Sequence, residues 1–297
     1  MVPSTSLHQP TNSAVPQIFD RALYRLRRAR GQRFGEDRFL LREAADGLSD
    51  RLGAVRRRFH SALDLASSPE SRRCLTPHAE QWTQLTLAAR DGGQLIGDEE
   101  ALPFGMQRFD LVTSVLSLHA VNDLPGTLVQ IRNLLRPDGL FVAALFGGDT
   151  LHELRAAFAA AELELRGGLS PRVSPFADVR SLGLLLQRAG FALPVTDVER
   201  TTVNYNNFAI LVRDLRAMGE VNYLHARERR PLTRSVLAAM LAHYQESFGT
   251  SQGQLKASFD IVYMTAWAPH DSQPKPLRPG AATTRLAEAL GTVERRA

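Results

Sequence analysis

Apolar residues follow two different patterns along this chain. Over residues 18–58, leucines recur at mixed spacings of three and four positions, with a break near Gly31 and Gly35, so an N-terminal helical segment is predicted. From Ser61 onward, short apolar runs alternate with segments of helical spacing. The clearest runs are 61–66, 109–118 and 140–146. Continuous runs of this length are typical of strands covered on both faces, so the pattern predicts an α/β domain with a mostly parallel sheet.

The later segments complete this prediction. Residues 123–135 carry apolar positions on one helical stripe, which Pro137 and Gly139 end, and this makes a crossover between two of the strands. After it we expect a helix over 176–189, an edge strand over 191–205, helices over 206–218 and 231–247, and a strand over 258–269. The predicted units are a disordered tail at 1–17, a basic helical segment at 18–58, an α/β domain at 59–269 with a helical insertion at about 206–247, and a proline-rich tail at 270–297.

The composition is that of a globular protein with one large domain. Of the 297 residues, 44% are hydrophobic and 23% are charged. The longest apolar stretches, 111–121 and 139–146, are shorter than the roughly 20 residues that span a bilayer. Cys74 is the only cysteine, which excludes an internal disulfide and favours a reducing compartment. Because residues 1–14 lack the features of a secretory signal, we expect a cytoplasmic location.

Positive charge is concentrated near the N-terminus. The 36 basic and 31 acidic residues give a net charge of +5, with arginine-rich runs at 21–33 and 56–58 that suit anionic partners. Aromatic side chains that would stack on bases are scarce around these runs, so no nucleic-acid partner is expected. Peripheral contact of the basic N-terminal helix with a membrane remains open, and the alternative is a solvated helix face.

Ligand chemistry is expected beyond the carboxyl ends of the strands, where open α/β sheets bind their ligands. Asp64 ends the first strand, and the turn in ALDLASSPE contains no glycine. Ala66 and Ser67 place Cβ atoms where a ligand would approach the backbone, and Pro69 removes an amide donor. Asp64 is therefore either a ligand of a cofactor or a cap at the strand end.

Motifs further along the chain carry a family resemblance. They are GDEEALPF at 97–104, RFDLVTSVLSLHAVND at 108–123, LLRPDGLFVAALFGG at 134–148 and LLLQRAGF at 184–191. In this order they resemble the class I S-adenosylmethionine-dependent methyltransferase superfamily. Three narrower motifs are FGGDTLHELR at 146–155, SPRVSPF at 170–176 and WAPHDSQPKPLRPGAA at 267–282. These are similar to the branch that contains the arginine hydroxylase of respiratory complex I assembly, and the likeness spans residues 18–282.

The resemblance implies a Rossmann-like fold with a seven-stranded, mostly parallel sheet, an N-terminal helical segment and a helical insertion. It implies S-adenosylmethionine as the cofactor, bound by Asp64, Ala66, Ser67, Asp98, Glu99, Ser114 and Val115. It implies a substrate site at Gly147, Gly148, Asp149, Thr150 and Arg155. It also implies a protein partner, a subunit of respiratory complex I, at the inner face of the respiratory membrane. The chain would chaperone this subunit or act on it by arginine hydroxylation.

The stretch from Asp64 to Asp98 is short for a methyltransferase domain. If 84–89 and 94–97 are strands, only four residues join them, whereas a parallel crossover takes a dozen or more. A hairpin or an irregular excursion is therefore expected. Asp91 is the nearest candidate for the carboxylate that would bind the ribose of the cofactor.

Some side chains leave two interpretations open. His119 follows a strand at the edge where ligands bind, so it is either a base or a buried, hydrogen-bonded histidine. Cys74 lies near Arg72 and Arg73, which would lower its pKa if it were reactive, and the alternative is a passive thiol. The histidines show no recognisable ligand spacing, so no metal site is expected. Two other functions also remain open: a catalytically silent binding protein with this fold, and a small-molecule carboxyl methyltransferase.

Overall fold

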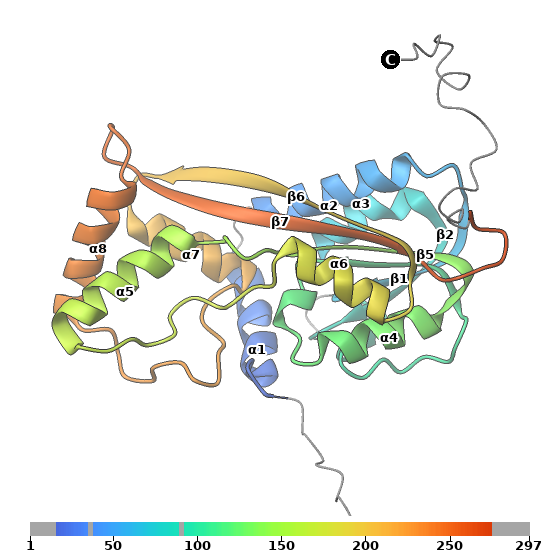
Figure 1. The fold of residues 1–297 in the computed structure, drawn as a ribbon, viewed down its shortest axis with the longest axis horizontal. Helices are drawn as coiled ribbons and strands as arrows, with labels where there is room; N and C mark the ends of the chain where they lie inside the picture. The colour runs from blue at the N-terminus through green and yellow to red at the C-terminus, as the bar shows by residue number, and fades with distance from the viewer. Residues whose placement is uncertain (1–15, 35–37, 89–91, 275–297) are drawn as a thin grey trace, which may run out of the picture.

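The computed structural model describes residues 16–34, 38–88 and 92–274, which form one twisted sheet with helices on both faces (Figure 1). The strand order is β3-β2-β1-β4-β5-β7-β6. The strands are β1 Phe59–Leu65, β2 Ala79–Thr86, β3 Leu95–Ile96, β4 Phe109–Val115, β5 Leu135–Phe146, β6 Ala192–Tyr205 and β7 Leu255–Trp267. The first five pair in parallel, and β7 runs antiparallel between β5 and β6. The predicted α/β fold with a mostly parallel, seven-stranded sheet is confirmed.

Two apolar layers cover the sheet. The helices are α1 Arg21–Gly31, α2 Phe39–Gly53, α3 Pro69–Leu75, α4 Leu124–Leu134, α5 His152–Arg166, α6 Val179–Arg188, α7 Phe208–Met218 and α8 Arg234–Phe248. Leucines of α2 share one buried cluster with residues of α5, α7 and α8, and those of α4 and α6 share the other. The strands β4 and β5 lie between these clusters and are buried on both faces, which is why their sequences are continuous apolar runs.

The helical insertion extends the molecule beyond the parallel half of the sheet. In Figure 1, β6 and β7 continue past the other strands to reach α5, α7 and α8. The ring of Tyr244 on α8 is fully buried, and its hydroxyl donates to the carbonyl of Lys256 on β7 at 2.9 Å.

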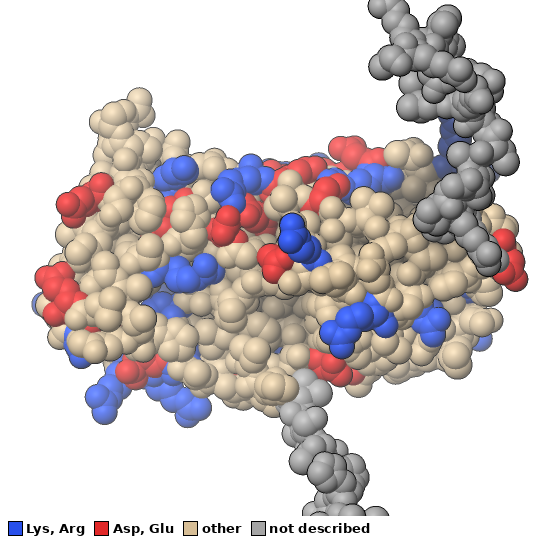
Figure 2. Space-filling view, in the orientation of Figure 1, with Lys and Arg blue, Asp and Glu red and all other residues tan. Residues whose placement is uncertain are grey.

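On the face of the molecule drawn in Figure 2, basic and acidic groups are interspersed over the upper half, and basic groups also project at the lower left edge.

Of the hairpin and the irregular excursion expected after β2, the hairpin is wrong. β2 and β3 pair in parallel, with Leu85 opposite Leu95 and Thr86 opposite Ile96. A parallel crossover normally has to return along the full length of a strand. Here β3 has only two residues, which pair with the last two residues of β2, so a short connection suffices. Residues 89–91 of this connection, including Asp91, lie outside the described residues.

Most of the two predicted tails, 1–17 and 270–297, also lies outside the described residues, which begin at Pro16 and end at Pro274. None of the helices within the described ranges is long and apolar enough to cross a bilayer.

Candidate functional site

The strand order reverses between β1 and β4, so a ligand cleft is expected beyond the carboxyl ends of these two strands. Asp64 lies near the end of β1 and is 1% exposed. Its carboxylate accepts hydrogen bonds from the Ser71 hydroxyl at 2.7 Å and the Thr113 hydroxyl at 2.9 Å. Burial raises the pKa of Asp64 in spite of these bonds. The contacts that surround Asp64 are those of a group that fixes the turn after β1.

The turn itself presents no bare backbone. Ala66 has φ of 51°, a left-handed conformation that costs an L-residue roughly 1–2 kcal/mol and that glycine would adopt freely. The Ser67 amide donates to the carbonyl of Leu85 at 2.9 Å, and the Ser68 side chain caps α3. Ala66 and Ser67 are 5% and 1% exposed. Other protein groups therefore already cover the segment expected to approach the cofactor.

An arginine of α1 pairs with the next two expected cofactor residues. The Arg21 guanidinium donates to the Asp98 carboxylate at 2.7 Å, to the Glu99 carboxylate, and to the carbonyl of Ala120 at 3.1 Å. Glu99 is fully buried and also accepts from the Ser117 hydroxyl. Burial raises the pKa of Asp98. The hydrogen bond from Arg21 and the positive charge of Arg21 lower it by more than burial raises it, so the pKa lies below its ordinary value. Both carboxylates are neutralised from within the chain.

Two more side chains of α1 enter the same cleft. The ring of Tyr24 is fully buried and meets Tyr223 edge-on, with 4.8 Å between ring centroids. It shares a buried cluster with Ala66 and with the residues that follow β2 and β4. The Arg28 guanidinium donates to the carbonyl of Leu116 at 2.7 Å and to the Tyr24 hydroxyl at 3.0 Å. For S-adenosylmethionine to reach the expected residues in this cleft, Arg21, Tyr24 and Arg28 of α1 would have to give up these contacts.

Ser114 and Val115 are the last two residues of β4, at the carboxyl end of the strand that borders the expected cleft. Both are buried, Ser114 pairs with Leu65 and Ala143 in the neighbouring strands, and the Ser114 hydroxyl has no hydrogen-bond partner among the described residues. The structure thus brings Asp64, Ala66, Ser67, Asp98 and Glu99 to one edge of the sheet, where Ser114 and Val115 end the neighbouring strand.

His119 is buried and hydrogen-bonded. Its side chain is 1% exposed, and its Nε2 lies 3.1 Å from the carboxylate of Glu220, which also accepts from the Tyr223 hydroxyl at 3.2 Å. The imidazole packs on the rings of Phe146 and Phe176, with centroid distances of 4.9 and 5.6 Å. Of the two interpretations open for His119, these contacts match the buried histidine.

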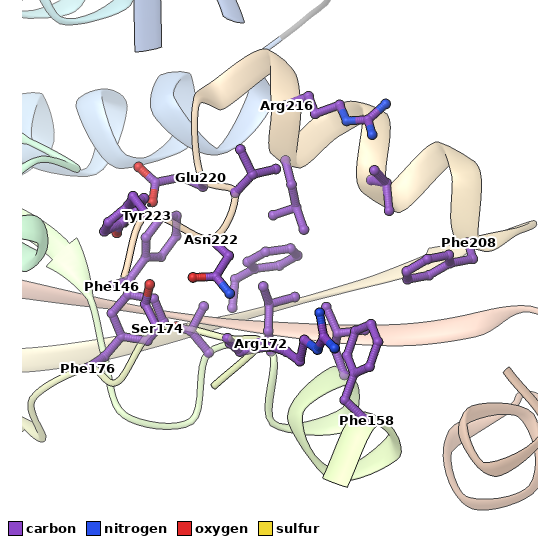
Figure 3. A pocket seen from close by; sticks show the side chains of 18 of the residues that line it. Phe146, Phe158, Arg172, Ser174, Phe176, Phe208, Arg216, Glu220, Asn222 and Tyr223 are labelled. Atoms are coloured by element: carbon purple, nitrogen blue, oxygen red, sulfur yellow. Dashed lines mark hydrogen bonds between the residues drawn. The ribbon is translucent and has the colours of Figure 1, made fainter. Parts of the chain in front are cut away.

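A separate cavity of about 280 Å³ lies beside the cleft (Figure 3). Aromatic rings dominate its walls: Phe146, Phe158, Phe176, Phe208, Tyr223 and Phe259. Figure 3 shows Glu220 and Tyr223 together at one end of the cavity and Phe158 with Arg172 at the other. It is an apolar chamber of the size of one large side chain, smaller than most small-molecule pockets.

The expected substrate segment borders this cavity, but most of it is held by the protein. The Gly147 amide donates to the carbonyl of Asp260 at 2.8 Å, and the Thr150 hydroxyl donates to the same carbonyl at 3.1 Å. The Asp149 carboxylate pairs with Arg200 at 2.7 Å. Of the expected residues Gly147, Gly148, Asp149, Thr150 and Arg155, only Thr150 lines the cavity.

Arg155 positions the cavity wall. Its guanidinium donates to the carbonyls of Gly148, Thr150 and Ser174 at 3.3–3.4 Å, so it joins α5 to the loop before α6. Ser174 lines the cavity, and Arg155 therefore acts on it through that loop.

The residues that the sequence analysis missed lie on α1 and after α7. Arg21, Tyr24 and Arg28 were included in a basic run, yet their spacing of three and four places them on one helical face. That spacing was the signal available. Glu220 and Tyr223 carried no comparable signal, because their approach to the cleft depends on the long connection between α7 and α8.

Of the two interpretations open for Cys74, its surroundings match the passive thiol. Burial, together with the neighbouring Asp46, raises its pKa to about 11 and outweighs the lowering effect of Arg73. Across residues 16–34, 38–88 and 92–274, no three His, Cys, Asp or Glu side chains are grouped so that they could hold a metal ion.

Comparisons with known proteins agree with this fold and with the motifs. The model of the family described as "Methyltransferase domain" matches residues 39–194. The chain is 38% identical over 310 residues to "Arginine-hydroxylase NDUFAF5, mitochondrial" of Homo sapiens, an alignment that covers 97% of this chain and 88% of that protein. The protein of the same name in Danio rerio is 45% identical over 194 residues, or 65% of this chain and 60% of that protein.

A solved structure shows the same fold at low identity. The YcgJ protein of Bacillus subtilis superposes with a TM-score of 0.52 over 77% of this chain and 99% of that chain, at 13% identity. The resemblance stated from the motifs is therefore confirmed, and its narrower form is favoured over a small-molecule carboxyl methyltransferase. The chain belongs to the methyltransferase-domain family, and within it to the family of the mitochondrial arginine-hydroxylase NDUFAF5.

Proposed function

We propose that this chain acts on an arginine side chain of a protein, a subunit of respiratory complex I. The observation that carries this proposal is the similarity, over 97% of the chain, to a protein named as an arginine hydroxylase. The modification we expect is hydroxylation: one hydrogen bonded to the arginine side chain is replaced by a hydroxyl group whose oxygen comes from molecular oxygen, while the second oxygen atom leaves as water with two electrons and two protons from an external reductant. A peripheral position at the inner face of the respiratory membrane belongs to the same proposal.

The aromatic cavity supports a planar, cationic side chain as the substrate. A guanidinium group stacks favourably on aromatic faces when water is excluded, and rings of Phe146, Phe176 and Tyr223 line the chamber. Its volume of about 280 Å³ suits one side chain of a protein better than a free cofactor-sized ligand. Thr150 and Ser174 add polar groups at the wall.

We further propose that S-adenosylmethionine binds in the cleft beyond β1 and β4 after α1 has moved away. Asp64, Ala66, Ser67, Asp98 and Glu99 lie at that edge of the sheet, the place where this class of fold binds its ligands. In the conformation described, α1 contacts this edge of the sheet through Arg21 and Tyr24.

Mass analysis of complex I subunits tests the proposed activity. Subunits isolated from cells that contain the gene should carry an arginine that is heavier by one oxygen atom than in cells without it. Re-expression of the wild-type chain should restore the added mass, and so should Arg188→Gln, which removes one exposed charge of α6 away from the site. Unchanged arginine masses in all these cells would refute the activity.

One observation favours a second candidate, a catalytically silent binding protein. The docking of Arg21, Tyr24 and Arg28 in the cleft is what such a protein would retain. Calorimetry of the full chain with S-adenosylmethionine separates the two. Micromolar binding, about −8 kcal/mol, supports the enzyme, whereas an absence of heat together with capture of a complex I subunit supports the binding protein.

A further inference from the structure

The aromatic cavity opens among arginines. Two outer hollows, of about 420 and 390 Å³, each share lining residues with the cavity and share Arg27 with each other. The guanidinium groups around these openings come from α1, α7 and two loops. We call them the arginine rim: Arg27, Arg30, Arg172, Arg216, Arg227 and Arg229.

The rim carries more positive charge than nearby carboxylates neutralise. Arg172 pairs with Glu162 at 2.6 Å, and Arg227 pairs with Asp20 at 3.2 Å. Among the residues that line the two outer hollows, Glu228 is the only acid, and its nearest guanidinium is that of Arg166 at 4.0 Å.

Three rim arginines have no acidic partner within the described part of the chain: Arg30, Arg216 and Arg229. All three are exposed. Exposure keeps them solvated in the free protein and leaves their donors available to a ligand.

Repulsion within the rim is visible at Arg27. Its side chain is half-buried and donates to the backbone carbonyl of Asn222, a neutral partner. Burial lowers the pKa of Arg27, and the positive charges of Arg227 and Arg30 lower it further. An anion bound at the rim would relieve this crowding.

We infer that the arginine rim binds acidic residues that flank the modified arginine in an extended segment of the protein substrate. The inference rests on the proposed function and names its substrate class. A cationic side chain approaching the cavity meets the rim, which repels it unless carboxylates arrive with it. The rim thus recognises an arginine in an acidic surrounding and rejects one in a basic surrounding.

The shape of the surface favours a peptide over a lipid bilayer. The rim arginines line concave hollows that share wall residues with the aromatic cavity, a form that suits a chain segment with one inserted side chain. A bilayer would instead meet a convex or flat surface.

Fluorescence anisotropy with labelled peptides tests the inference. The probes are three short peptides with a central arginine flanked on both sides by pairs of glutamates, pairs of glutamines or pairs of lysines. For the wild-type full chain we expect the glutamate peptide to bind about ten-fold more tightly than the glutamine peptide, with the advantage lost at high salt.

Matched variants assign the effect to the rim. Arg216→Gln should weaken the glutamate peptide about five-fold. A triple variant of Arg30, Arg216 and Arg229 to Gln should abolish the preference for glutamate. A control with Arg58, Arg180 and Arg188 changed to Gln removes the same net charge from exposed positions elsewhere and should retain the preference.

Four results would overturn the inference: no binding of the glutamate peptide, equal binding of the glutamate and glutamine peptides, equal losses in the rim and control variants, or rim-dependent binding of phosphatidylglycerol vesicles without a peptide preference. Failure of the proposed function looks different. In that case the glutamate preference persists, and arginine masses in the complex I subunits stay unchanged.

Discussion

Removal of the Arg21 guanidinium should destabilise the chain by breaking a buried ion pair. Arg21 joins α1 to Asp98 and Glu99, and its side chain is 10% exposed, while that of Glu99 is fully buried. The substitution Arg21→Met keeps an unbranched apolar side chain and removes the charge. Glu99 is then left with the Ser117 hydroxyl as its remaining side-chain partner.

The expected loss follows from the burial of Glu99. Loss of one partner of a buried ion pair costs about 3–5 kcal/mol, because the remaining charge stays uncompensated. The matched control is Arg25→Met, since Arg25 also pairs with Asp98 but is 37% exposed. An exposed pair of that kind is worth about 0.2–1 kcal/mol. The double variant Arg21→Met/Glu99→Gln should lose less stability than Arg21→Met alone, because no buried charge remains unpaired.

Urea unfolding followed by tryptophan fluorescence measures these differences, and their pH dependence supplies a second check. Arg21 holds the pKa of Asp98 below its ordinary value of 3.8, against the effect of burial. A depressed pKa stabilises the folded state above pH 3.8, and this contribution is lost as the pH falls through the folded-state value. The difference between the wild type and Arg21→Met should therefore shrink below pH 3.8.

Equal stabilities of Arg21→Met and Arg25→Met would refute the reasoning. That result would mean that α1 does not dock on the buried carboxylate in solution. A double variant that loses as much as the sum of its single variants would also contradict the proposed pairing of Arg21 with Glu99.

Two other predictions concern the cavity wall and the thiol. Glu162 is fully buried, and its carboxylate accepts from Arg172 at 2.6 Å and from the amide of Ser170 at 2.6 Å. Glu162→Ala should therefore lower the free energy of unfolding by about 3–5 kcal/mol and speed hydrogen exchange over 169–176. Exchange unchanged from the wild type would contradict this role. Burial and Asp46 raise the pKa of Cys74 to about 11, so the rate of its alkylation by iodoacetamide should increase with pH, with a midpoint near that value. A midpoint at about 8.5, the pKa of a free thiol, would show that the burial of Cys74 and its contact with Asp46 are absent.

The sequence predicts the central strands well because their environment is uniform. β4 is buried throughout and β5 is buried from Gly139 to Phe146, so apolar residues dominate both strands, and α4 between them shows one clean apolar stripe. β2 and β3 are different. Six of the eight residues of β2 are exposed or partly exposed and β3 has only two residues, so neither presents a continuous apolar run, and the short linker suggested a hairpin or an irregular excursion.

The sequence did not predict that arginines of α1 enter the cleft. Arginine is usually a surface residue, so the run over 21–33 indicated a solvated or anion-binding face. Arg21 and Arg28 instead lie in the protein, where two carboxylates, two backbone carbonyls and the Tyr24 hydroxyl accept hydrogen bonds from them. Such burial depends on acceptors supplied by residues about 80 positions away, which the local sequence of α1 does not contain.

Hydrogen exchange of α1 with and without S-adenosylmethionine tests most directly whether the helix and the cofactor compete for one cleft. Calorimetry on the same sample first establishes that the cofactor is bound. Deuterium uptake over Arg21–Gly31 should then increase on addition of the cofactor, because the helix must leave Ala66, Asp98 and Glu99. Bound cofactor with unchanged or lower uptake over these residues would show that both occupy the protein together, and would contradict the competition.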